Sequence, residues 1–248
     1  MKRIQDKGEW TYGINPVFEA IKSGRKINTV YVYDQSRQNL STIIEAARAN
    51  GIPVKSETRI FFDNRFHKGH QGIAASLGKR ETITVEELLG IPAGRGEIPF
   101  FVILDTIDDP RNFGAIIRIA DAAGVHGVVF QSHRSAGLTP VAAKASAGAL
   151  EYVALVETVN IKHAMEKMRK ADIILIGAEA GTDKTLWDLD LRIPLAMVVG
   201  SEGAGLRRTV RDMCDTTVSL PMKGTVNSLN VSVAAGIFAY EVLRQRKS

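Results

Sequence analysis

Residues 100–130 read FFVILDTIDDPRNFGAIIRIADAAGVHGVVF, and this stretch decides the fold. The run over 101–104 is wholly apolar, which is typical of a strand buried on both faces of a sheet. A helical pattern follows over 115–123 and stops at Gly124, and the apolar run at 127–130 predicts another strand. A strand, a helix and a second strand in this order predict a parallel sheet with helices on its faces.

The same alternation extends along the rest of the sequence. Beyond residue 130 we expect strands over 152–156, 173–176, 195–199 and 217–220, and helices over 139–148, 161–170, 206–214 and 229–246. Residues 8–80 read as a smaller α/β unit, with helices over 15–23, 40–50 and 58–64 and strands over 30–33, 52–54 and 72–77. We therefore predict a first domain over 1–79, a linker over 80–98 with one helical turn at 85–89, and a second domain over 99–248.

Composition and charge narrow the class of protein. The single cysteine, Cys214, excludes an internal disulfide and fits a reducing compartment. No apolar run is long enough to span a bilayer, and residues 1–7 lack the apolar core of a signal peptide, so we expect a cytoplasmic protein without a membrane partner. The net charge is +5, but residues 1–80 hold 14 Lys and Arg against 7 Asp and Glu. This concentration of positive charge favours a polyanionic partner over an ordinary solvated surface.

Polar residues follow the strand expected at 101–104. Asn112 and Arg118 lie six residues apart in the segment that opens the next helix. In open parallel sheets, ligands bind beyond the carboxyl ends of the strands. An arginine in the second turn of an otherwise apolar helix needs a carboxylate or a phosphate as its partner. A ligand phosphate and a structural ion pair are equally good explanations, the latter with one of three nearby carboxylates, Asp105, Asp108 or Asp109.

Two more strand ends carry unusual loops. Residues 200–205 read GSEGAG, but the dinucleotide fingerprint fails because Arg208 stands where the third glycine belongs. Glu202 would repel a phosphate, so this turn suits a ligand with hydroxyl groups or positive charge, or else Glu202 is only a helix-terminus charge. Residues 219–236 read SLPMKGTVNSLNVSVAAG, a strand end and loop that open an apolar helix. Ser228 or Asn230 could cap that helix, but a cap needs only one of them.

Two other features have simpler interpretations. Cys214 lies in an apolar helical segment and reads as a buried, inert thiol. His67 and His70 are two potential ligands without a third nearby, so we predict no metal site.

Together the three strand ends resemble the ordered motifs of the SpoU class of RNA 2′-O-ribose methyltransferases, in the SPOUT superfamily. The motifs are Asn112 with Arg118, GSEGAG over 200–205, and LPM over 220–222 followed by SLNVS over 228–232. Upstream, YGINPV over 12–17 and HQGIA over 70–74 resemble the RNA substrate-binding domain of many members, which is similar to kink-turn-binding ribosomal proteins. The resemblance covers nearly the whole chain.

The resemblance implies an α/β parallel-sheet SPOUT domain with a C-terminal trefoil knot, preceded by a small α/β RNA-binding domain. It implies S-adenosylmethionine as the cofactor, a homodimer formed through the C-terminal domain, and RNA rather than DNA as the partner. The implied reaction is 2′-O-methylation of a guanosine ribose in 23S rRNA. Methylation of tRNA and a non-catalytic role in RNA binding or ribosome assembly stay open as alternatives.

The resemblance also implies roles for individual residues. The expected catalytic residues are Asn112, Arg118, Glu202, Ser228 and Asn230. The expected cofactor-binding residues are Val199, Gly200, Gly203, Leu220, Met222, Ser228 and Leu229. For RNA contacts we expect Arg59, Arg65, Lys68 and Arg111. Because an arginine is effectively never deprotonated in a protein, we expect Arg118 to bind a phosphate and stabilise the developing alkoxide rather than act as a base. Asn112 would orient Arg118 or the ribose, and Glu202 would fix Arg118 or the substrate hydroxyls.

Overall fold

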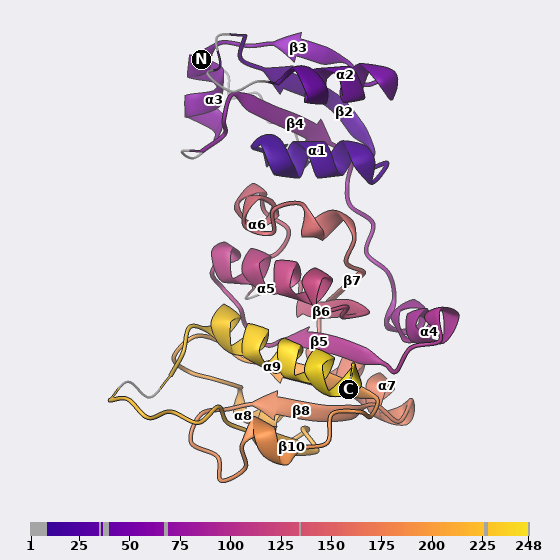
Figure 1. Ribbon diagram of the computed structural model, residues 1–248, viewed down its shortest axis with the longest axis vertical. Helices are drawn as coiled ribbons and strands as arrows, with labels where there is room; N and C mark the ends of the chain where they lie inside the picture. Colours follow the sequence, from indigo (N-terminus) through magenta and orange to yellow (C-terminus); the bar gives the residue numbers. More distant parts are fainter. Residues whose placement is uncertain are drawn as a thin grey trace. The chain divides into compact units, whose positions relative to one another are not determined.

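The computed structural model describes residues 9–34, 36, 40–66, 69–133, 135–225 and 228–247. The chain forms two compact units (Figure 1). The first comprises the residues up to 81 together with 138–152, and the second comprises 82–137 and 153–248. The segment 138–152 thus interrupts the second unit in sequence but packs with the first. The functional domain boundaries predicted from the sequence stay a prediction.

The first unit is built on a four-stranded sheet in the order β1-β4-β2-β3. Its elements are β1 (Glu9–Tyr12), α1 (Ile14–Lys22), β2 (Ile27–Val32), α2 (Ser41–Ala49), β3 (Val54–Ser56), α3 (Arg59–Arg65) and β4 (Ile73–Leu77). Strand β4 pairs antiparallel with β1 and β2, whereas β2 and β3 are parallel. Apolar residues of α1 and α2, such as Val17 and Ile43, form a buried cluster with Val30 and Ile73 of the sheet.

The segment from the middle of the chain is fixed to this unit by named contacts. It contains α6 (Pro140–Ala145) and a short 3₁₀-helix, Ala149–Glu151. Arg80 Nη2 lies 2.6 Å from Glu151 Oε1, and both side chains are largely buried. Tyr152 donates a hydrogen bond to Glu19 Oε2 at 2.5 Å. The expected strand at 152–156 therefore begins later, as β7 (Leu155–Thr158).

The second unit contains a six-stranded sheet in the order β10-β8-β9-β5-β6-β7, with every pairing parallel, as the sequence predicts. Its strands besides β7 are β5 (Phe100–Leu104), β6 (Gly127–Gln131), β8 (Ile174–Ala178), β9 (Leu195–Val199) and β10 (Thr216–Val218). Its helices are α4 (Val85–Arg95), α5 (Pro110–Ala122), α7 (Ile161–Lys170), α8 (Arg208–Arg211) and α9 (Val231–Arg246). The trefoil knot stays a prediction.

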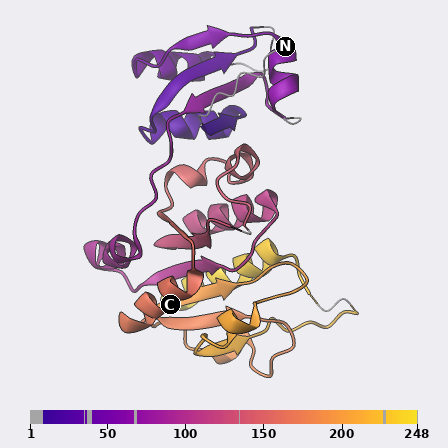
Figure 2. The same ribbon diagram turned by 180° about the vertical axis from the view of Figure 1, so that it is seen from behind.

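Helices cover both faces of this sheet. Helices α5 and α9 lie side by side on one face (Figures 1 and 2), where Phe113 of α5 meets Phe130 of β6 edge-on at 5.2 Å between ring centroids. On the other face, Leu88 of α4 and Met165 of α7 join a buried cluster with Phe101 and Ile103 of β5. The central strands are therefore buried on both sides, which explains their continuous apolar runs.

Two helices are longer than expected, α5 at its N-terminal end and α4 at its C-terminal end. Helix α5 begins at Pro110, since Asp109 accepts a hydrogen bond from the Arg111 N–H at 2.8 Å and proline suits the first helical position. Helix α4 begins after Thr84, which forms a reciprocal capping box with Glu87, and it continues through Pro92. The helical turn expected at 85–89 is thus a full helix packed on the second unit.

Among the helices in the described part of the chain, none is both long and apolar enough to cross a membrane. The described residues also contain no group of three or more His, Cys, Asp or Glu side chains placed to hold a metal ion.

Candidate active site

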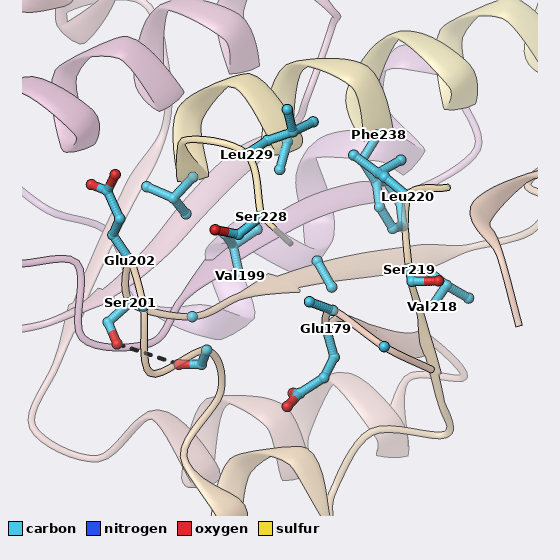
Figure 3. Close-up of a pocket in the computed structure, with 18 of the residues that line it drawn as sticks. Glu179, Val199, Ser201, Glu202, Val218, Ser219, Leu220, Ser228, Leu229 and Phe238 are labelled. Atoms are coloured by element: carbon cyan, nitrogen blue, oxygen red, sulfur yellow. Dashed lines mark hydrogen bonds between the residues drawn. The ribbon is translucent and has the colours of Figure 1, made fainter. Parts of the chain in front are cut away.

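A cavity of about 350 Å³ opens at the carboxyl ends of β8, β9 and β10 (Figure 3). This volume lies within the range of small-molecule sites. Every residue predicted to bind the cofactor lines it: Val199, Gly200, Gly203, Leu220, Met222, Ser228 and Leu229. Glu202, predicted as catalytic, also lines it. The second and third predicted motifs therefore come together in one hollow, although they lie about twenty residues apart in sequence.

The glycines of the 200–205 turn allow the backbone to fold tightly on itself. Ser201 and Gly205 exchange two backbone hydrogen bonds of 3.0 Å each. A Cβ atom on Gly200 would lie 2.2 Å from the carbonyl carbon of Gly205, so no other residue fits there without moving the turn. Gly203 and Gly205 have φ values of 91° and 67°, in the left-handed region that glycine adopts without strain. The turn presents Glu202 at the edge of the cavity (Figure 3).

An ion pair between a buried carboxylate and a partly exposed arginine fixes this turn to the sheet. Asp105, fully buried at the end of β5, accepts hydrogen bonds from the Arg207 backbone N–H at 2.9 Å and from Arg207 Nε at 2.7 Å. Arg207 Nη2 also donates to Gln131 Oε1, at the end of β6, at 2.7 Å. The pairing of Asp105 with Arg207 was not among the expected contacts. The sequence did hold a signal, because Asp105 directly follows a buried strand and Arg207 lies two residues after the glycine turn.

A chain of hydrogen bonds links the three predicted motifs. Asn230 Nδ2 donates to Asn112 Oδ1 at 3.0 Å, and Asn112 Nδ2 donates to Glu202 Oε2 at 3.0 Å. Asn230 also caps α9, since its Oδ1 accepts from the backbone N–H groups of Ser232 at 3.0 Å and Val233 at 3.4 Å. Asn230 therefore caps α9 and also holds Asn112, while its catalytic role stays a prediction.

The helix cap sets the direction of this chain. Because the Oδ1 of Asn230 faces backbone N–H groups, its Nδ2 must face Asn112. Asn112 then turns its oxygen towards Asn230 and its amide nitrogen towards Glu202. Asn112 is only 8% exposed, so its orientation is held by these partners. The position of the Glu202 carboxylate therefore depends, through Asn112, on Asn230 at the N-terminus of α9.

Arg118 does not join this network. It lies exposed on α5, and it forms no hydrogen bond or ion pair with any residue that the structure describes. The proposed structural ion pair with Asp105 is excluded, because Asp105 is committed to Arg207. We expected Arg118 to need a charged partner because it would be buried in an apolar helix. This expectation is wrong, since the side chain of Arg118 is exposed to solvent. Its guanidinium is thus available to a partner outside the described residues.

The cavity wall has an apolar side and a polar side. Figure 3 shows Leu220 and Phe238 together at one end, and Ser201 and Glu202 at the other. Such a division suits a ligand that joins a flat apolar ring to polar groups. S-adenosylmethionine, with its adenine, ribose and amino-acid parts, is a ligand of this kind, and the lining residues therefore fit it.

Cys214 is half-buried rather than fully buried as expected, and it lies in a bend after α8 rather than in the helix expected over 206–214. Its Sγ lies 3.6 Å from the carbonyl oxygen of Val210, to which it donates. Burial, reinforced by the carboxylates of Asp215, Glu179 and Asp105, raises the pKa of the Cys214 thiol to about 12. The reactive thiolate is therefore scarce at neutral pH.

The residues predicted to contact RNA fall in both units. Arg59 and Arg65 lie exposed on α3 in the first unit, where the Arg65 guanidinium carbon is 4.5 Å from the ring centroid of Trp10. Arg111 lies exposed on α5 in the second unit. Lys68 lies outside the described residues.

Comparison with known proteins gives matches over almost the whole chain. The family model described as SpoU rRNA Methylase matches residues 99–240, and the one described as RNA 2′-O ribose methyltransferase substrate binding matches residues 10–82. The chain is 38% identical to the 23S rRNA (guanosine-2′-O-)-methyltransferase RlmB of Shewanella oneidensis, over 98% of this chain and 99% of that protein. It is also 38% identical, over 98% of both chains, to a Bacillus subtilis protein named for the TrmH family of tRNA/rRNA methyltransferases.

Among solved structures, the chain resembles the SpoU methyltransferase AviRb of Streptomyces viridochromogenes in complex with AdoMet. The TM-score is 0.79 at 27% identity, and the match covers 98% of this chain and 92% of that one.

Proposed function

We propose a function that follows from the family of this chain. The chain belongs to the SpoU rRNA methylase family, and it is an RNA 2′-O-methyltransferase that uses S-adenosylmethionine. Within that activity, the substrate we propose is a guanosine ribose of 23S rRNA. The single observation that carries the catalytic part of the proposal is the hydrogen-bonded chain from Asn230 through Asn112 to Glu202 at the mouth of the cavity.

The cavity would hold the cofactor through backbone groups and apolar contacts. Val199, Leu220 and Leu229 give the apolar wall, and the 200–205 turn gives backbone polar groups. When bound, the cofactor supplies an electrophilic methyl group on a sulfonium. The remaining task of the protein is to place a ribose 2′-hydroxyl in line with that methyl group, and positioning of this kind accounts for a large part of many enzymatic rate enhancements.

We assign the polar residues to that task. Glu202, held at Oε2 by Asn112, would accept a hydrogen bond from a substrate hydroxyl. Arg118 would bind a backbone phosphate of the RNA and stabilise the negative charge that develops on the 2′-oxygen as its proton leaves. Arg118 would not accept the proton itself, because its guanidinium stays charged, so the proton of the 2′-hydroxyl would pass to solvent water. Its exposure and its lack of a described partner support a role towards a bound substrate.

The choice of substrate is tested directly with RNA. Purified protein is incubated with methyl-labelled S-adenosylmethionine and with separate rRNA and tRNA pools that lack modifications, and the labelled nucleotide is mapped. We expect label in 23S rRNA at the 2′-oxygen of a guanosine. Label confined to tRNA would overturn the rRNA assignment but keep the methyltransferase, and binding of RNA without any transfer would support the non-catalytic alternative.

For the first unit we propose contact with the RNA backbone. Arg59 and Arg65 on α3 are both exposed, and the guanidinium of Arg65 lies over the rings of Trp10 and Phe61. Arg59→Ala with Arg65→Ala should weaken RNA binding and reduce its dependence on salt, because fewer counterions are released. Removal of residues 1–80 is a poorer test, since it would also uncover the partners of segment 138–152. Unchanged affinity across several salt concentrations would refute the assignment.

We also propose a homodimer formed through the C-terminal domain in the cytoplasm. Val233 and Tyr240, two helical turns apart on α9, are each about half exposed, and Leu229 before the helix is 37% exposed. Apolar side chains spaced in this way form a stripe that a second copy could cover. Light scattering should give twice the mass of the chain, and Val233→Glu with Tyr240→Glu should give the monomer mass. A monomer at all concentrations of the unaltered protein would contradict the dimer.

A further inference from the structure

One carboxylate in the cavity is not used by the chemistry above. Glu179 follows β8 directly, and its side chain is 19% exposed. Its Oε1 lies 3.6 Å from Arg211 Nη1, whereas its Oε2 is buried without a hydrogen-bond partner among the described residues. A buried carboxylate oxygen without a donor is costly, and Glu179 lines the cavity, so a ligand bound there can supply the donor that this carboxylate lacks.

The position of Glu179 is fixed by its surroundings. Its backbone N–H donates to the carbonyl oxygen of Val218 at 3.0 Å, which extends the pairing between β8 and β10. A Cβ atom on Gly205 would lie 3.6 Å from Glu179 Oε1, so the carboxylate faces the glycine turn. Figure 3 shows the same arrangement, with the carboxylate directed away from Leu220 and Phe238. The carboxylate therefore faces the polar part of a bound cofactor rather than its adenine ring.

From this geometry we infer that Glu179 binds the ribose hydroxyls of the cofactor. An ionised carboxylate only accepts hydrogen bonds, and a vicinal diol offers two neutral donors. The ammonium group of the cofactor is a weaker candidate, because the carboxylate on the same carbon atom would be repelled by Glu179. A carboxylate that binds a ribose hydroxyl near the ends of parallel strands is also the arrangement found in dinucleotide-binding folds.

The test is a comparison of ligands by isothermal titration calorimetry, without RNA and without turnover. The ligands are S-adenosylhomocysteine, 5′-methylthioadenosine, which lacks the amino-acid part, and a 2′,3′-dideoxy form of 5′-methylthioadenosine. The unaltered protein should bind 5′-methylthioadenosine about 10- to 100-fold more tightly than the dideoxy form, the range for hydrogen bonds to a charged group. Glu179→Ala should bind both nucleosides with the same low affinity.

The control variant is Glu157→Ala. Glu157 is an exposed carboxylate on β7, at the opposite edge of the same sheet. It should keep the preference for the diol, and thermal melting should show that both variants are folded. If Glu179→Ala does not fold, the affinities of the unaltered protein for the two nucleosides still test the inference. Equal affinities for both nucleosides would overturn it.

Two further outcomes are distinguishable. A loss of affinity in Glu179→Ala for S-adenosylhomocysteine but not for 5′-methylthioadenosine would place Glu179 at the ammonium group and overturn the ribose assignment. Failure of the unaltered protein to bind S-adenosylhomocysteine at all would count against the cofactor assignment itself.

Discussion

The side chain of Asn230 caps helix α9 with its oxygen and holds Asn112 with its nitrogen. A single amide therefore links the stability of the last helix to the position of Glu202, which Asn112 holds in turn. Capping and positioning use different atoms of Asn230, so substitutions can separate the two tasks.

Asn230→Asp keeps the capping oxygen and loses the donor to Asn112. Because a carboxylate at a helix N-terminus is favourable, the free energy of unfolding should stay within about 0.5 kcal/mol. Methyl transfer should fall about tenfold, since two acceptor oxygens would then face each other. Asn230→Ala should lose about 1 kcal/mol of stability as well. Urea unfolding and initial rates measure the two effects, and an Asp variant with full activity would refute the positioning role.

Gly200→Ala tests the tight turn. The added Cβ would lie 2.2 Å from the Gly205 carbonyl carbon, so the turn and Glu202 must move. Methyl transfer should drop about 100-fold, the cost of a misplacement of roughly 1 Å at a reacting centre. Gly224→Ala, in the loop between β10 and α9, is the matched control, because its Cβ would meet no atom of the described residues within 4 Å. Equal activity in the two variants would show that the turn does not position the site.

Neighbouring arginines should differ sharply in their effect on stability. Arg207→Ala leaves the buried Asp105 carboxylate without its charged partner and should cost about 3 kcal/mol of unfolding free energy. Arg208→Ala removes an exposed ion pair, in which Arg208 Nε lies 3.8 Å from Asp212 Oδ2. This variant should change the free energy of unfolding by less than about 0.5 kcal/mol. Chemical denaturation measures both. Similar losses in the two variants would contradict the structural role assigned to the Asp105–Arg207 pair.

Cys214 should resist alkylation in the native protein. With its pKa raised from 9.0 to about 12, the thiolate fraction at pH 8 is about 1,000-fold lower than that of a thiol at the ordinary value. Labelling with iodoacetamide should be slow in buffer and fast in urea, where burial is lost. Raising the pH towards the native pKa should accelerate the native reaction. Equal labelling rates with and without urea at pH 8 would contradict this prediction.

The sequence predicts the sheet of the second unit well, because strands buried on both faces leave continuous apolar runs such as 101–104. It also predicts that Asn112, Glu202 and Asn230 lie near one another, because strand ends of a parallel sheet share one edge. The pairing of Asp105 with Arg207 was not predicted, because Asp105 was considered only as one of three possible carboxylate partners of Arg118.

Two other features depend on tertiary packing that local patterns do not record. Arg118 stands in an apolar helix, yet it faces solvent because α5 buries only the side towards the sheet and α9. Segment 138–152 has the small-residue composition of a helix within the second domain, but its contacts lie with the first unit. Neither the direction of a single side chain nor the partner of a short segment follows from periodicity alone.

The most direct test of the central claim measures 2′-O-methylguanosine by mass spectrometry in digests of 23S rRNA treated with the unaltered protein or with Arg118→Ala. The account predicts that the unaltered protein forms this nucleoside and that the variant forms it at least about 100-fold more slowly. Both proteins should bind S-adenosylhomocysteine with similar affinity, because Arg118 is exposed and is not among the residues that line the cavity. A base-methylated product, or a near-normal rate in Arg118→Ala, would contradict the account.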